Sequence, residues 1–286
     1  MSDTRPSYYW ALRRELWENK SIYIAPLVVA GVCLFMGFIN AVSLPHRMPR
    51  ILTLDAQKQH QAIEGPFDFT AAMIIITAFL VGVFYCVDAL YSERRDRSIL
   101  FWKSLPVSDR TTVLSKAGVP LVVLPALVYP LVMITHLFML FMCSALLLPN
   151  RAGLALLWSQ EHFFASCIAV LYSIVVMALW LAPFFAYLLL VSAWARRGPF
   201  LWAVLPPLVM AAFERGAFGT KYLFLFIGAR LAGWFPRAVV VDHNPNPLES
   251  LTPGRFLATP GLWIGFVFAV AFLAVAVRLR RNREPI

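Results

Sequence analysis

A charged loop lies between two long apolar stretches, in the order FTAAMIIITAFLVGVFYCV (residues 69–87), DALYSERRDRSILFWKSLPVSDRTTVLSK (88–116) and AGVPLVVLPALVYPLVMITHLFMLFMCSALLLP (117–149). Apolar runs of about 18 or more residues with few charges are typical of helices that span a membrane. The order therefore predicts two membrane spans joined by a basic, aromatic loop at the membrane surface. A soluble partner would have access to such a loop.

The whole chain has the composition of a membrane protein. Of its 286 residues, 60% are hydrophobic and 14% are charged, and the mean hydropathy is +0.71. Soluble domains have about 45–50% apolar and about 25% charged residues. We therefore expect an all-α integral membrane protein with six transmembrane helices. The expected spans are residues 22–44, 67–90, 117–148, 163–195, a fifth segment that begins at Phe200, and 261–277.

The first 20 residues form a unit of their own in this prediction, ahead of a membrane domain at 21–286. Helical periodicity within this unit predicts an amphipathic helix that lies in the membrane interface. Arg14, Glu15, Glu18 and Asn19 occupy its polar face. The alternative is a plain aromatic and basic flank of the first span. The apolar face holds Tyr9, Trp10, Leu12, Leu16 and Trp17.

The fifth apolar segment is irregular. Residues 200–213 are uncharged but short, and Glu214, Arg215 and Gly216 separate them from a second apolar run at 217–235. Half-length apolar segments predict a re-entrant or interfacial hairpin before the last span. Region 214–260 is then extracytoplasmic. The sequence does not decide whether residues 217–235 span the membrane, re-enter it or lie on its surface. Glu214 and Arg215 are interpreted as the point where the helix reaches the interface, in preference to a polar site within the membrane.

Several breaks between and within spans are also expected. The polar segments 45–66 and 149–162 separate neighbouring spans. The third apolar stretch is longer than the ~20 residues of a straight span, and Pro120, Pro125 and Pro130 predict kinks in its first half. His136 lies inside this stretch, where we expect a hydrogen bond between helices in preference to a role in a transport pathway.

The distribution of Lys and Arg predicts the orientation. Sixteen of the 25 Lys and Arg residues lie in four segments on one side of a six-span topology, at 1–20, 91–116, 196–199 and 278–286. By the positive-inside rule, both termini and the 91–116 loop are cytoplasmic, which predicts a multi-pass protein of the plasma (inner) membrane. The chain has a net charge of +10, and its Lys and Arg residues flank the spans. We therefore expect these cations to contact membrane lipids, and we do not expect nucleic acid as a partner.

The sequence lacks motifs for nucleotide binding and for metal binding. A phosphate-binding loop ends in Gly-Lys-Ser or Gly-Lys-Thr. Here Lys20-Ser21 and Lys103-Ser104 are preceded by Asn19 and Trp102 instead of glycine. The four cysteines and five histidines show no metal-ligand spacing. We therefore expect no catalytic residue, no metal site and no cofactor in this chain.

The charged loop has internal order. Glu93 and Arg97 have the spacing of a favourable helical ion pair, and Ser98 is placed to cap a short helix that Pro106 ends. Ser108 or Asp109 is placed to cap the helix that leads into the third span. The short helix is apolar and aromatic, which suits insertion into a partner's groove. The alternative is a positive-inside loop with an interfacial aromatic belt.

The loop resembles the one after the second span in permeases of the type-2 ATP-binding-cassette (ABC) exporter family. The resemblance rests on ERRDRS at 93–98, a short aromatic-aliphatic helix, KSLPVS at 103–108 and the later Lys116. In that family the loop forms a cytoplasmic coupling helix that docks into a cleft of a separate ATPase subunit. The resemblance therefore implies contact with an ATPase for Glu93, Arg97, Ile99, Phe101, Trp102, Lys103, Leu105 and Pro106.

The resemblance also implies the assembly and the activity. Two copies of the ATPase hold ATP and Mg, and a second permease chain completes a homodimer or heterodimer that works by alternating access. The family's second and fifth spans line the pathway, which makes Phe79, Phe84, Met210 and Phe213 candidates by location, with ordinary packing as their alternative. The expected cargo is a hydrophobic or amphipathic compound such as a lipid, peptide or drug. A membrane-embedded enzyme and a non-transporting scaffold are the alternative functions.

Overall fold

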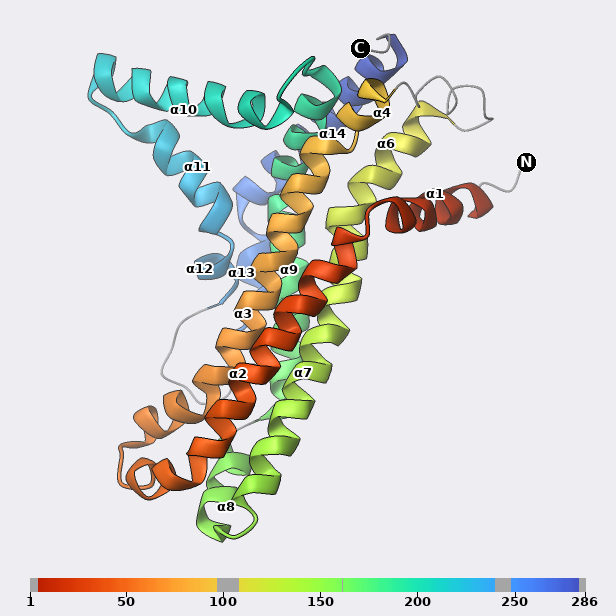
Figure 1. Cartoon of the computed structure of the whole chain (residues 1–286). Helices are drawn as coiled ribbons and strands as arrows, with labels where there is room; N and C mark the ends of the chain where they lie inside the picture. The colour runs from red at the N-terminus through yellow and green to blue at the C-terminus, as the bar shows by residue number, and fades with distance from the viewer. Residues whose placement is uncertain (1–4, 97–107, 161, 240–247, 283–286) are drawn as a thin grey trace.

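The computed structural model describes residues 5–96, 108–160, 162–239 and 248–282. Apart from one isolated antiparallel bridge between Val239 and Leu251, every regular element in this described part is a helix. Six of the helices found there are long and apolar enough to cross a membrane. The chain is therefore an all-helical, multi-pass membrane protein (Figure 1).

The elements fall into a long bundle and a side arm (Figure 1). The bundle consists of α2, α3, α7, α9 and α14, and the arm consists of α10 and α11, which diverge from it. In chain order the elements are α1 Arg5–Glu18, α2 Ser21–Ile51, α3 Ala56–Asp88, α4 Tyr91–Arg95, α6 Asp109–Gly118, the π-helical turn η1 Val119–Val123, α7 Leu124–Leu147, α8 Arg151–Gln160, α9 Phe163–Trp194, α10 Pro199–Phe218, α11 Tyr222–Ala232, α12 Phe235–Ala238, α13 Pro253–Leu257 and α14 Pro260–Asn282.

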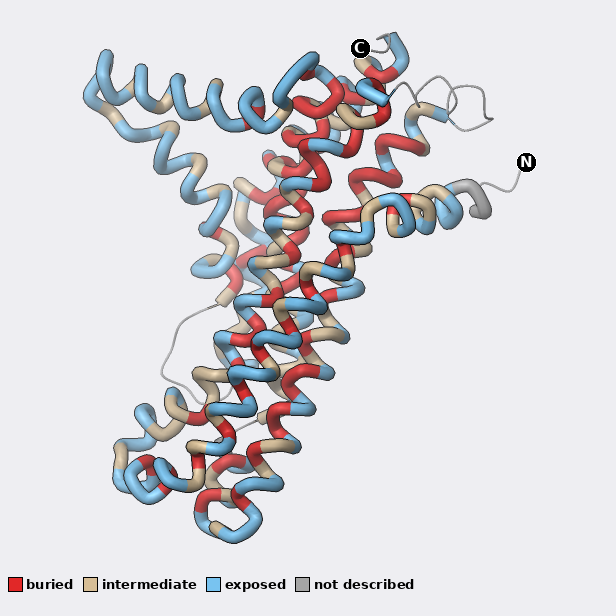
Figure 2. The backbone as a smooth tube through the Cα atoms, in the orientation of Figure 1, coloured by how far each residue is buried: buried red, intermediate tan, exposed pale blue. Residues whose placement is uncertain are grey.

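Helix α9 is the most buried of the candidate spans, with 67% of its most apolar window buried. Figure 2 shows that the buried residues concentrate along the bundle. Ala178, Ala182 and Ala186 follow one another at four-residue spacing, and all three are buried. Gly265 and Ala269 are buried on α14 at the same spacing. Small residues at this spacing let membrane helices approach closely. The contact between α9 and α14 is the most extensive between any two helices of the described part.

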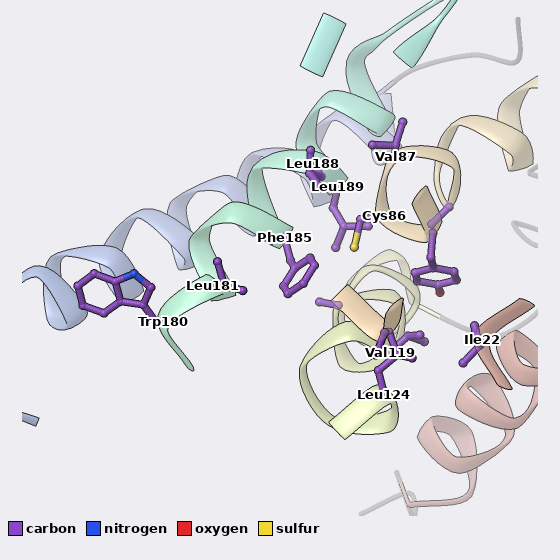
Figure 3. Packing of buried hydrophobic residues seen from close by; sticks show 14 of the residues in the cluster. Ile22, Cys86, Val87, Val119, Leu124, Trp180, Leu181, Phe185, Leu188 and Leu189 are labelled. Atoms are coloured by element: carbon purple, nitrogen blue, oxygen red, sulfur yellow. The ribbon is translucent and has the colours of Figure 1, made fainter. Parts of the chain in front are cut away.

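The core follows α9 toward the end of the bundle that holds α4 and α6. Figure 3 shows Leu188 and Leu189 of α9 beside Cys86 of α3, with Val119 and Leu124 across from them. A second buried cluster occupies the opposite end, where α2, α3, α7 and α8 meet. Because lipid tails are as apolar as these side chains, close packing is what holds the helices together.

Two predicted polar breaks are largely helical, which corrects the expectation for 45–66 and 149–162. Helix α2 continues through Pro45 to Ile51, α3 begins at Ala56, and α8 occupies 151–160. These extensions are stabilised by packing beyond the apolar spans, since Met48 is fully buried and lies against Gly153. The polar residues after 44 mark the end of the apolar span, but α2 itself continues to Ile51.

The irregularity expected in the third apolar stretch lies at η1, a π-helical turn over Val119–Val123. Pro120 lies within this turn and Pro125 follows it. A proline ring clashes with the preceding turn and removes a hydrogen bond donor, and a π-helical turn is one of the recognised causes of a bend.

The predicted break at residues 214–216 is wrong. Helix α10 runs without interruption from Pro199 to Phe218 and ends at Gly219, whose φ of 68° is left-handed. A left-handed residue is the common end of a helix, and glycine adopts it without steric cost. Charged residues do not stop a helix, so Glu214 and Arg215 continue it.

Helices α10 and α11 form a hairpin that Glu214 closes. Its carboxylate accepts hydrogen bonds from the Thr220 hydroxyl (2.6 Å) and from the backbone N–H groups of Tyr222 (2.7 Å) and Leu223 (2.8 Å). These two N–H groups belong to the first turn of α11, where no intrahelical acceptor exists. Glu214 is thus a helix cap of the hairpin.

The returning end of the hairpin is anchored on the bundle. Trp180 Nε1 donates to the carbonyl of Arg230 (2.9 Å), and Arg230 Nη1 donates to the carbonyl of Gly261 (3.0 Å). Gly265 lets the Arg230 guanidinium approach, because a Cβ at this position would lie 1.9 Å from Nη2. Along α10, in contrast, only 6% of the apolar window is buried, so its apolar side chains are left uncovered (Figure 2).

Candidate functional site

Six charged side chains meet at the end of the bundle where α1, α4, α6 and α14 come together (Figure 1). We call this group the ionic cluster. It contains three cations and three carboxylates, so its formal charges balance. Its members are Arg14 and Glu15 of α1, Glu93 of α4, Asp109 and Lys116 of α6, and Arg280 of α14.

Lys116 lies at the centre of the ionic cluster. Its Nζ is 3.0 and 3.2 Å from the two carboxylate oxygens of Glu15 and 3.2 Å from Oε1 of Glu93. Glu15 also accepts from the Tyr85 hydroxyl at 2.7 Å and from Arg14 Nη2 at 3.0 Å. The Lys116 side chain is 3% exposed and the Glu15 side chain 0%. Each buried charge therefore has an opposite charge within hydrogen-bond distance, as burial of a charge requires.

Arg280 connects the ionic cluster to the last helix. Its Nη2 donates to Oε2 of Glu93 at 3.1 Å, and its Nη1 pairs with Asp109 at the start of α6. The periodicity of α14 places this arginine inward, because Ala269, Ala276 and Arg280 share its buried face. The Ser108 side chain caps α6 by accepting from the Thr111 N–H at 3.1 Å. The predicted cap at Ser108 is thereby confirmed.

A second set of buried contacts fixes α4 to the end of α9. The Ser192 hydroxyl accepts from the backbone N–H groups of Leu90 and Tyr91, both at 3.0 Å. Arg94 donates to the carbonyl of Ser192 at 3.3 Å and to the carbonyl of Ala195. Arg94 is buried, and both carbonyls at the C-terminal end of α9 accept from its Nη2.

Together, these contacts fix both ends of the segment 97–107 to the bundle. On its N-terminal side, Glu93 and Arg94 join α4 to α6, α9 and α14. On its C-terminal side, Asp109 and Lys116 join α6 to α1, α4 and α14. A force applied to the segment would therefore act through α4 and α6 on α1, α9 and α14, since the pairs of Lys116 with Glu15 and Glu93 and of Arg280 with Glu93 are buried.

Of the residues predicted to contact an ATPase, the structure describes Glu93. The other seven lie outside the described residues: Arg97, Ile99, Phe101, Trp102, Lys103, Leu105 and Pro106. The predicted pairing of Glu93 with Arg97 therefore stays a prediction. Within the described part, Glu93 is buried and faces Lys116, Arg280 and Arg14.

The structure places the four predicted pathway residues in different surroundings. Phe79 packs in the core against Phe184, with ring centroids 6.1 Å apart, and lines a cavity of about 20 Å³ between α3, α7 and α9. Phe84 is exposed and stacks on Phe200. Met210 and Phe213 are exposed on α10. Their assignment to a pathway stays a prediction. The expected hydrogen bond of His136 is present, because its Nε2 lies 3.0 Å from the carbonyl oxygen of Phe67 on α3.

The position of Glu15 differs from the sequence-based expectation. Periodicity placed it on the exposed polar face of an interfacial helix, and instead it is fully buried. The exposed face of α1 holds Tyr9, Trp10 and Trp17, and the interfacial position of this helix stays a prediction. Glu15 faces the other way because Lys116 neutralises its charge and the Tyr85 hydroxyl donates a hydrogen bond to it, and these two residues lie about 70 or more positions away in sequence. One available signal was Lys116 itself, a cation next to the third apolar run.

The environment of Glu15 predicts a dependence of stability on pH. Burial raises the pKa of Glu15, but the charge of Lys116 and hydrogen bonds from Tyr85, Lys116 and Arg14 outweigh it, so this pKa lies below its ordinary value of 4.5. The folded state then binds fewer protons than the unfolded state, and acidification through this range destabilises the fold. Thermal unfolding between about pH 6 and about pH 3 is expected to show a falling midpoint.

Glu15→Gln removes this contribution, so its unfolding midpoint is expected to depend less steeply on pH than that of the native chain. Asp55→Asn is the matched control, because the Asp55 side chain is 84% exposed and an exposed pair contributes little. Identical pH profiles for the native chain and Glu15→Gln would contradict an ionised, paired Glu15.

Comparison with known proteins gives no identification. No family model, curated protein or solved structure matches this chain. The basis for a functional proposal is therefore the sequence of the charged loop and the geometry that holds its two ends.

Proposed function

We propose that this chain is the transmembrane permease subunit of an ATP-driven exporter of the type-2 ABC class. The observation that carries the proposal is the attachment of both ends of segment 97–107 to the bundle. Arg94 holds one end on α9, and the ionic cluster holds both ends on α1 and α14. A loop that only connects two spans has no need of so many buried charges, since each is expensive to desolvate. A loop that receives force from a partner needs stiff ends.

The sequence of the loop supports an ATPase as that partner. ERRDRS at 93–98 and KSLPVS at 103–108 resemble the coupling loop of such permeases. In the proposed assembly, Phe101, Trp102 and Leu105 insert into the ATPase, and aromatic side chains of this kind dominate the binding free energy of interfaces. ATP and Mg are held by the ATPase, which is expected in two copies. Glu93 acts internally, by passing the displacement of α4 to α6 and α14.

The positions of the basic segments support a common membrane side. The N-terminal helix, α4, the start of α6 and the C-terminal end of α14 all lie at one end of the bundle (Figure 1). These are three of the four segments that carry the excess of Lys and Arg. We propose that this end is cytoplasmic and that α1 lies in the interface of the plasma (inner) membrane.

The uncovered arm supports a second permease chain. Helix α10 is 20 residues long and apolar, but 6% of its apolar window is buried in one chain. We propose that α10 and α11 pack against a second copy or a related chain and that a pathway for a hydrophobic or amphipathic compound forms between the two chains. Phe84, Met210 and Phe213 are exposed on this side of the single chain, which leaves them available to such a pathway.

Purification of the tagged full chain from its native membrane tests the proposal. A bound protein with a Gly-Lys-Ser/Thr phosphate-binding loop is expected, together with ATP hydrolysis by the complex and none by the chain alone. A chain that acts on a lipid or peptide substrate without ATP would instead support a membrane enzyme. A bound partner that has no ATPase activity would support a scaffold. Either result would overturn the permease assignment.

A further inference from the structure

A groove lies between α6 and α14, next to the ionic cluster but separate from it. Its volume is about 740 Å³, within the range of about 300–1,000 Å³ that is common for ligand sites. Two kinds of side chain line it. The basic group is Arg110, Arg278 and Arg281, and the apolar group is Leu114, Val270, Leu273, Ala274 and Val277, with Asn282 at the end.

The two groups are ordered along the groove. On α6, Arg110 is followed one turn later by Leu114. On α14, Val270 precedes Arg278 by about two turns. Because the two helices run in opposite directions along the groove, both place their cations at the arginine-rich end of the bundle and their apolar side chains deeper along it. The groove therefore has a basic mouth and an apolar wall that continues into the bilayer.

The charged residues that line the groove are all arginines. No carboxylate is among its lining residues. In the part of the chain that the structure describes, Arg110 and Arg278 have no ion pair, and both are exposed. The neighbouring carboxylate, Asp109, is already paired with Arg280. Arg110 and Arg278 thus attract an anion.

We propose that this groove is a binding site for one anionic phospholipid, with its phosphate at Arg110 and Arg278 and an acyl chain along Leu114 and Val270. Basic pockets between transmembrane helices are known to bind anionic headgroups, and the apolar wall selects an amphiphile over a free anion. The lipid would link the ends of α6 and α14 beside the Asp109–Arg280 pair. This site goes beyond the proposed transport function, and lipid binding is measured without ATP, an ATPase or a cargo.

Native mass spectrometry of the purified full chain tests the site with dioleoyl phosphatidylglycerol as the probe and dioleoyl phosphatidylcholine as the neutral comparison. The native chain is expected to retain phosphatidylglycerol in preference to phosphatidylcholine. The double variant Arg110→Gln/Arg278→Gln is expected to weaken this retention about tenfold or more, since each cation near an anionic headgroup contributes favourably. The matched control is Arg196→Gln/Arg197→Gln, which removes two exposed arginines from the turn before α10 and is expected to retain the lipid.

Two further experiments identify the molecule that occupies the groove and its position. Ala274→Phe fills the apolar wall without a change of charge and is expected to weaken retention, whereas soluble glycerol phosphate at millimolar concentration is expected not to displace the lipid. Unfolding midpoints in phosphatidylcholine confirm that each variant is folded. If the groove double variant and the control double variant lose equal amounts of bound phosphatidylglycerol, the lipid is held only by general attraction to surface charge, which would overturn the proposal. Displacement by glycerol phosphate alone, or full retention by Ala274→Phe, would also overturn the proposal.

Discussion

Replacing Lys116 by methionine is expected to lower the free energy of unfolding by about 3–5 kcal/mol, the usual cost of removing one partner from a buried ion pair. The substitution leaves the carboxylates of Glu15 and Glu93 without the ammonium that lies within 3.2 Å of both. Arg14 and Arg280 still contact these carboxylates, but each carboxylate has lost one of its ion-pair partners. Thermal unfolding in one detergent measures the loss, together with the yield of folded protein in the membrane.

Lys20→Met is the control for this prediction, because it makes the same chemical change at an exposed lysine. Its effect is expected to stay within about 0.5 kcal/mol. The double variant Glu15→Gln/Lys116→Met removes one charge of each sign, so it is expected to recover part of the stability that Lys116→Met loses. If Lys116→Met unfolds at the same temperature as Lys20→Met, the ionic cluster does not stabilise the fold.

Trp102→Asp is expected to weaken binding of the ATPase at least about thirtyfold, which corresponds to the 2 kcal/mol or more of an interface hot spot. The reason is that a carboxylate cannot enter an apolar groove without losing its water. Leu105→Asp is expected to act in the same way. Trp102→Phe keeps an aromatic side chain and is expected to keep most of the binding. Binding of the added ATPase to the permease in nanodiscs measures the effect, while membrane insertion should be unchanged.

The transmembrane helices were predictable because the bilayer imposes a simple rule on sequence. A span needs about 20 apolar residues, and the predicted fourth span at 163–195 coincides with α9, Phe163–Trp194. The helical extensions of α2 and α8 were not predictable in this way, because contacts such as Met48 with Gly153 stabilise them. Local polarity contains no information about such contacts.

The ionic cluster was predictable only in part. The resemblance of the loop singled out Glu93 and Lys116, but it did not predict that these two residues pair with each other. The burial of Glu15 and Arg280 depends on residues more than 60 positions away, Tyr85, Lys116 and Glu93. Periodicity places a side chain on a face of its helix, but only the tertiary fold determines whether that face meets water, lipid or an opposite charge.

The amount of ATPase that remains bound to the purified chain, compared between Trp102→Asp and Trp158→Asp, tests the central claim most directly. Trp158 is 55% exposed on α8, at the end of the bundle opposite α4 and α6, so both variants make the same substitution on different surfaces. The account predicts native amounts of ATPase with Trp158→Asp and about a tenth or less with Trp102→Asp. Equal amounts of ATPase with the two variants, or none with the native chain, would contradict docking of an ATPase on residues 97–107.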